Sequence, residues 1–228
     1  MTSCTAAAAS PLGTREAFIT RTYVHLLGAV FAFVFLEAVY FSTGTARSIG
    51  LALLSVNWLL VLGAFVVIGW LARGLAARTR SQRMQYVGLG GYVVAESIIF
   101  VPLLFVADYY APGTIKSAAL LTLVAFGGLT LVAFHSRRDF SFLRGLLKWA
   151  GVLALTAIVG AIVFRAGLGT WFSIAMIAFA GAAILHDTSN VLRNFPDDAH
   201  VAASLELFAS VALMFWYVLS LISSSRRS

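Results

Sequence analysis

Three acidic residues lie within or directly beside long apolar segments, where an ionised carboxylate is costly. Glu96 is near the middle of the apolar segment 86–107, Asp187 follows the segment 167–185, and Glu206 is early in the segment 201–222. A charged side chain at the centre of a bilayer costs about 2.5–3.5 kcal/mol, and such residues usually face a partner or a water-filled cavity. These three acids are the first candidates for a functional site.

Asp187 has polar neighbours at helical spacing. Asn190 lies three residues further on, so a helix would place both side chains on one face. His186 can change charge near neutral pH. The alternative is that Asp187 is a helix-end acid that reaches out to water. No second His or Cys lies at ligand spacing from His186, so we expect no transition-metal site.

Glu206 and Ser210 are four residues apart and would share one stripe of a helix. Glu96 is the most central of the acids, although a neutral glutamate used only in helix packing would explain it equally well. Arg73 is the cation best placed by sequence to pair with a buried acid, and it can equally be a topology anchor. The sequence leaves these alternatives open.

Seven apolar segments must position these residues. Each has 18 to 23 residues, which is enough for a helix rising about 1.5 Å per residue to cross a hydrocarbon core of about 30 Å. With 61% hydrophobic and 11% charged residues, the composition excludes the soluble classes. We therefore predict an all-α integral membrane protein with seven transmembrane helices, at residues 23–41, 49–71, 86–107, 117–134, 146–164, 167–185 and 201–222.

The net charge of +7 is unevenly distributed over the loops. Loops on the N-terminal side contain most of the basic residues, including Arg15, Arg73 and Lys148. This bias predicts a cytoplasmic N-terminus and an external C-terminus. It also predicts that the basic residues contact the headgroups of a bilayer and not nucleic acid. We expect a flexible cytoplasmic tail at 1–21, one membrane domain at 22–223 and a short tail at 224–228.

Signatures of enzymes are missing from the sequence. It contains no G-x-S-x-G, no H-E-x-x-H and no glycine-rich phosphate loop, and the seventh apolar segment has no lysine for retinal. We therefore expect a protein that is not an enzyme and has no resident cofactor.

Three segments resemble the Bax inhibitor-1 family, and more narrowly its bacterial YccA branch. Residues 135–143 (HSRRDFSFL) are similar to the basic loop and D-F-S-F-L of the family, and residues 184–190 (ILHDTSN) to I-L-x-D-T-S-N of the branch. Residues 21–23 (RTY) are similar to the R-x-T-Y that opens the first helix. Residues 96–102 (ESIIFVP) are a weaker match to E-G-x-x-x-G-P, with Ser97 and Val101 in place of the glycines.

The resemblance implies six helices around a central seventh, and in some members a pH-sensitive calcium leak. In that mechanism an acid of the sixth helix pairs with one of the seventh, and an arginine at the end of the second helix latches the closed state. Asp187 matches the first acid and Arg73 the latch. Ser210 stands at the position of the second acid, so that carboxylate is missing, and Glu206 lies one turn away.

These observations predict a proton-sensitive gate centred on Asp187. Arg73 is expected to be its closing partner, Glu206 and Ser210 to belong to the gate, and Glu96, Asn190 and His186 to line the pore. Calcium would pass transiently at Asp187 and Glu206. The resemblance also implies the bacterial inner membrane, and it offers an alternative function, modulation of the membrane protease FtsH without ion conduction. Transport of another small solute is a third possibility.

Overall fold

The computed structural model describes residues 11–78, 81–136 and 139–225, and within these ranges the chain is helical with short connections. This confirms the predicted all-α class. The helices are α1 (Pro11–Ser42), α2 (Thr45–Ser55), α3 (Trp58–Arg78), α4 (Gln82–Tyr110), α5 (Thr114–His135), α6 (Leu143–Val163), α7 (Gly169–Arg193) and α8 (His200–Ser225).

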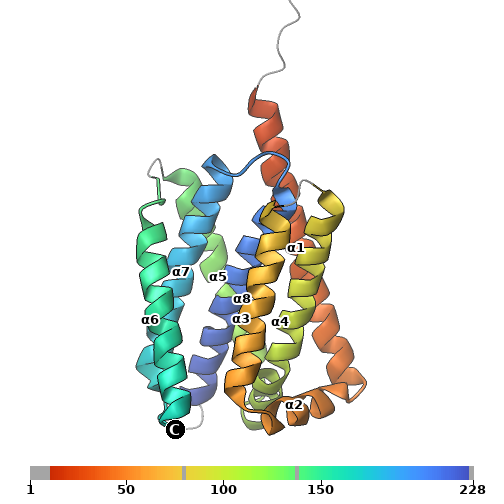
Figure 1. Ribbon diagram of the computed structural model, residues 1–228, viewed down its shortest axis with the longest axis vertical. Helices are drawn as coiled ribbons and strands as arrows, with labels where there is room; N and C mark the ends of the chain where they lie inside the picture. Colours follow the sequence, from red (N-terminus) through yellow and green to blue (C-terminus); the bar gives the residue numbers. More distant parts are fainter. Residues whose placement is uncertain (1–10, 79–80, 137–138, 226–228) are drawn as a thin grey trace, which may run out of the picture.

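The last helix, α8, is the centre of the bundle. It packs against α1, α3, α4, α5 and α7, whereas α6 lies at the periphery against α7 and α3 (Figure 1). More than half of the most apolar part of α8 is buried inside the bundle, whereas none of that part of α6 is. Small residues such as Ala203 and Ala209, both buried, let neighbouring backbones approach closely. The expected central seventh span is confirmed in α8.

The outer surface of the bundle suits a membrane. Within the described ranges, α1, α4, α5, α6, α7 and α8 are each long and apolar enough to cross a bilayer, and the bent pair α2 and α3 makes a seventh span if it is counted as one. Large apolar side chains such as Phe31 and Leu153 point outward and are about two-thirds exposed. The start of α1 and the end of α8 lie at opposite ends of the bundle (Figure 1).

The predicted second span, residues 49–71, has the wrong boundaries. The chain bends by 109° between α2 and α3, so α2 lies across one end of the bundle while α3 stands beside α4 (Figure 1). Val56 has extended backbone angles that end α2. Asn57 is the N-cap of α3, because its side-chain oxygen accepts a hydrogen bond from the backbone N–H of Leu59 at 2.9 Å. Hydropathy is continuous across this break, and only the capping residue marks it.

The predicted flexible tail also needs correction, because α1 begins at Pro11. Phe18 is 1% exposed. The guanidinium of Arg15 lies 4.7 Å from the centre of the Phe18 ring. Residues 11–21 are therefore a packed helical extension. Residues 1–10 and 226–228, and Arg137 and Arg138 of the basic loop, lie outside the described residues.

Arg15 ties this extension to the C-terminal end of α7. It donates hydrogen bonds to the carbonyls of Val191 at 2.6 Å, Leu192 at 3.2 Å and Phe195 at 2.6 Å. It also forms an ion pair with Asp197 at 2.8 Å. The last carbonyls of a helix have no partner within the helix, and a cation there also interacts favourably with the helix dipole. Arg15 therefore caps α7 from a residue far away in sequence.

We expect Arg15→Ala to destabilise the protein by about 2 kcal/mol or more, because hydrogen bonds to a charged group each contribute about 1.5–3 kcal/mol. Asp197→Asn removes only the half-exposed ion pair, and it should cost less than about 1 kcal/mol. Thermal unfolding of the purified protein in detergent would measure both. Equal losses for the two variants would show that the ion pair, and not carbonyl capping, gives Arg15 its role.

Candidate functional site

Five predicted residues converge between α3, α4, α7 and α8. They are referred to here as the polar cluster: Arg73, Glu96, Asp187, Glu206 and Ser210. Arg73 comes from the last turns of α3 and Asp187 from the last turns of α7, and these ends lie at the same end of the bundle as the start of α1 (Figure 1). Glu206 and Ser210 are one turn apart on α8, and Glu96 lies midway along α4.

Asp187 is held by two hydrogen bonds. The hydroxyl of Ser210 donates to one carboxylate oxygen of Asp187 at 2.5 Å, and Nδ1 of His186 lies 3.0 Å from the other. Ser210 is 7% exposed. A hydroxyl that donates to a carboxylate makes a charge-assisted bond, stronger than a neutral one. Ser210 thus provides a hydrogen-bond donor for the Asp187 carboxylate, at the position where the resemblance expects a second acid.

Arg73 contacts Glu206 instead of Asp187. Its Nε lies 3.7 Å from a carboxylate oxygen of Glu206, and the two side chains are 49% and 35% exposed. Within the described part of the chain, no Arg73–Asp187 ion pair forms, although the two charges interact electrostatically over a longer distance. Exposed ion pairs with such separations contribute about 0–1 kcal/mol. The structure therefore brings the predicted latch to a different acid, through a loose contact.

Glu96 is the most deeply buried acid of the polar cluster. It is 5% exposed and is hydrogen-bonded to Tyr92, one turn earlier on α4. Tyr92, itself 4% exposed, was missed by the sequence reasoning. The i, i+4 spacing of Tyr92 and Glu96 was the available signal.

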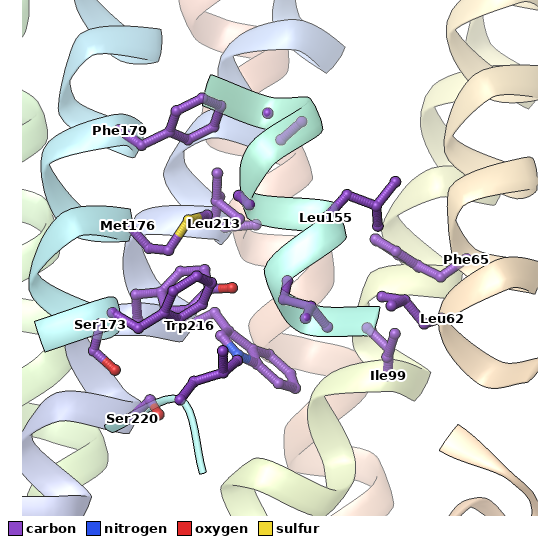
Figure 2. A pocket seen from close by; sticks show the side chains of 18 of the residues that line it. Leu62, Phe65, Ile99, Leu155, Ser173, Met176, Phe179, Leu213, Trp216 and Ser220 are labelled. Carbon is purple, nitrogen blue, oxygen red and sulfur yellow. The ribbon is translucent and has the colours of Figure 1, made fainter. Parts of the chain in front are cut away.

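A cavity of about 660 Å³ borders the polar cluster, between α3, α4, α6, α7 and α8 (Figure 2). Arg73 and Glu96 line it on one side, and Ser220 and Ser224 of the last turns of α8 line it on another. Because α3 and α8 run in opposite directions, these two parts lie toward opposite ends of the bundle (Figure 1). Most of the remaining lining is apolar.

A second cavity, of about 320 Å³, is polar. His186 and Asn190 line it, together with Asp139, Ser141, Arg144, Ser189 and Asn194. The predicted pore-lining residues are thus divided between the two cavities. Glu96 lines the larger one, and His186 and Asn190 line the smaller one. Asp187 and Ser210 themselves line neither cavity, but their chain neighbours His186 and Ala209 line the smaller and the larger one, respectively.

Two of the segments noted in the sequence meet at the smaller cavity. The backbone N–H of Phe140 donates to the hydroxyl of Ser189 at 3.3 Å. The backbone N–H of Ser141 donates to Asp139 at 2.9 Å, and this hydrogen bond lowers the pKa of the Asp139 carboxyl. Ser189 was not selected by sequence reasoning, but it joins the loop after α5 to α7, as does Arg193, which donates to the carbonyl of Ser136 at 3.3 Å.

A tight metal site is not built from the described residues. No group of three or more His, Cys, Asp or Glu side chains in the described ranges could hold a metal ion. Asp187 and Glu206, predicted to meet calcium in transit, interact electrostatically with each other across α7 and α8. Together they offer a negatively charged region and not a coordination cage.

Comparison with known proteins adds independent information. The Golgi anti-apoptotic protein of Vaccinia virus (strain Lister) is 28% identical over 141 residues, covering 61% of this chain and 58% of the relative. Bax inhibitor 1 of Schizosaccharomyces pombe is 27% identical over 176 residues, covering 72% and 61%. An uncharacterized membrane protein of Vibrio cholerae serotype O1 is 26% identical over 142 residues, covering 60% of each. The chain thus spans about three fifths of the length of these curated relatives.

The family described as inhibitor of apoptosis-promoting Bax1 matches residues 15–227, from the Arg15 cap to beyond the end of α8. This match includes every helix that contributes to the polar cluster. The chain is therefore a multi-pass membrane protein that belongs to the Bax inhibitor-1 family.

Proposed function

We propose that this protein is a cation leak in which the protonation state of Asp187 controls the passage of ions through the polar cluster. The observation that carries the proposal is the Ser210–Asp187 hydrogen bond at 2.5 Å, which joins the central helix α8 to α7 within the polar cluster. An ionised Asp187 attracts cations to this cluster. A protonated Asp187 removes that charge and leaves Arg73 to repel them.

The contact between Arg73 and Glu206 suits a movable part of the gate. At 3.7 Å and about half exposed, it contributes little to stability, so separating the two side chains costs little. Rotation of Arg73 away from Glu206 would add a second free carboxylate beside Asp187. We propose that this movement opens the path and that the observed contact represents the closed arrangement.

Calcium is the proposed permeant ion, as cargo in transit. Calcium prefers six to eight oxygen ligands, and the acids of the polar cluster supply far fewer. Weak, partial coordination lets an ion leave as readily as it binds, which conduction requires. The resemblance to the YccA branch supports placement in the bacterial inner membrane, and the charge distribution supports an orientation with the start of α1 in the cytoplasm and the end of α8 outside.

The alternative is a regulatory membrane protein that modulates FtsH. It rests on the resemblance of residues 184–190 to the YccA branch. A flux measurement in proteoliposomes decides between the leak and the regulator, because only a leak lets ions cross the membrane.

Asp187→Asn should lower calcium entry into proteoliposomes by about tenfold at pH 7.5, the effect of about 1.4 kcal/mol. For the original protein, entry should depend on pH, because the proposal makes the charge of Asp187 the control of passage. For Asp187→Asn, the profile should be flat. An internal calcium dye would measure entry. An unchanged pH profile in the variant would contradict the gate, and absence of flux with recovery of FtsH in a pull-down would favour the regulator.

Ser210→Asp restores the second acid that the resemblance expects, and it should change the pH profile. Two adjacent carboxylates cannot both ionise easily, so one should stay protonated to a higher pH. The midpoint of the flux profile should therefore move toward higher pH. Ser210→Ala should instead remove the contact between α7 and α8 and raise leakage.

Ser204→Ala is the matched control for Ser210→Ala. Ser204 is also buried on α8, but its hydroxyl donates to the carbonyl of Val201 within the same helix, at 2.7 Å. If Ser204→Ala and Ser210→Ala changed the flux equally, the role assigned to Ser210 would be wrong.

A further inference from the structure

The larger cavity has the dimensions of a hydrocarbon chain. Its volume of about 660 Å³ is within the range of small-molecule pockets, about 300–1,000 Å³. Its lining on α8 extends from Ala209 to Ser224, which is about 22 Å along a helix rising about 1.5 Å per residue. One leaflet of a hydrocarbon core about 30 Å thick spans about 15 Å. A single acyl chain therefore fits along the cavity.

The walls of the larger cavity are unsuited to water. Figure 2 shows Met176 of α7, Leu213 and Trp216 of α8 and Ile99 of α4 around the hollow. Polar groups such as Arg73 and Ser224 also line the cavity, but its apolar side chains form most of the wall and favour an apolar ligand. The proposed ion path uses the polar cluster at one side of the larger cavity. It gives no role to the apolar part of that cavity.

The side of the larger cavity between α3 and α6 is its most loosely packed side. Helix α6 packs only at the periphery, against α7 and α3, and most of its side chains are exposed or half-buried. Leu155 of α6 and Phe65 of α3 point toward one another across the cavity in Figure 2. Both are flexible apolar side chains, so a lipid tail can enter between α3 and α6 without disturbing a polar contact.

A cation lies on the wall of this apolar space. Arg73 lines the cavity, its side chain is 49% exposed, and its contact with Glu206 is loose. A guanidinium forms strong, paired hydrogen bonds with carboxylate or phosphate groups. The combination of a long apolar space and a half-exposed arginine matches a molecule with one anionic group and one tail.

We infer that the larger cavity binds an anionic amphiphile, with one acyl chain along α8 and the headgroup at Arg73. The shared chemistry is a tail with a negatively charged head, which a free fatty acid or an anionic phospholipid supplies. The occupant excludes water from the apolar part of the bundle and competes with Glu206 for Arg73. Binding of the amphiphile is measured without ion flux, so its test is independent of the proposed leak function.

Photo-crosslinking in detergent tests this inference with the full-length protein. One probe is a fatty acid with a diazirine in its tail, and the other is phosphatidylglycerol with the same group in one acyl chain. We expect labelling of Leu155, Phe65 or Trp216 that saturates near one probe per protein and is abolished by excess palmitate or unlabelled phosphatidylglycerol. Labelling by the fatty acid alone identifies a free fatty acid, and labelling by both identifies a lipid-derived tail.

Ala154→Trp supplies the variant test, because Ala154 lines the cavity and a large side chain would fill it. It should lower labelling of the cavity residues by about tenfold. Ala157→Trp is the matched control, since Ala157 is exposed on the same helix one turn away. It should leave labelling unchanged.

Arg73→Gln tests the headgroup. It should weaken competition by palmitate several-fold while leaving competition by a neutral lysophosphatidylcholine unchanged. Labelling confined to outward-facing residues such as Leu153, with no competition in the original protein, would overturn the inference. Equal labelling of Ala154→Trp and Ala157→Trp would overturn it as well. Competition is also measured on the original protein, so this part of the test does not depend on whether a variant folds.

Discussion

The hydrogen bond from Ser210 to Asp187 is the interaction on which the polar cluster depends. A carboxylate enclosed between helices needs a donor, because an unsatisfied buried charge is far more costly than an unsatisfied neutral group. Ser210 supplies that donor from the central helix α8, which packs against α1, α3, α4, α5 and α7. The same contact holds α7 close to α8 at the level of the polar cluster.

The end of α7 that contains Asp187 is fixed by several other contacts. Arg15 caps its last carbonyls from α1, and Ser189 accepts a hydrogen bond from the loop after α5. These contacts are short and partly buried. The contact between Arg73 and Glu206 is longer and exposed. The bundle therefore combines a fixed carboxylate on α7 with a cation on α3 that can move.

The two cavities give the protein two chemically different environments. The smaller has carboxylate, hydroxyl, imidazole and amide groups, while the larger is mostly hydrocarbon with Arg73 and Glu96 on one side. Polar lining suits hydrated ions, and apolar lining suits tails of lipids. A lipid in the larger cavity would act on the proposed gate through Arg73, the residue that both share.

The sequence by itself determined the all-α class, the number of apolar segments, the acids within them and the resemblance that family membership confirms. These features depend on composition and on local spacing, which a single chain displays directly. It did not show the break at Asn57, because apolar residues continue on both sides, nor the packing of residues 11–21. Only the tertiary structure decided that Arg73 meets Glu206, that Ser210 meets Asp187, and that Glu96 and His186 face different cavities. The physical reason is that helical periodicity fixes which residues share a face, whereas packing around α8 fixes which faces meet.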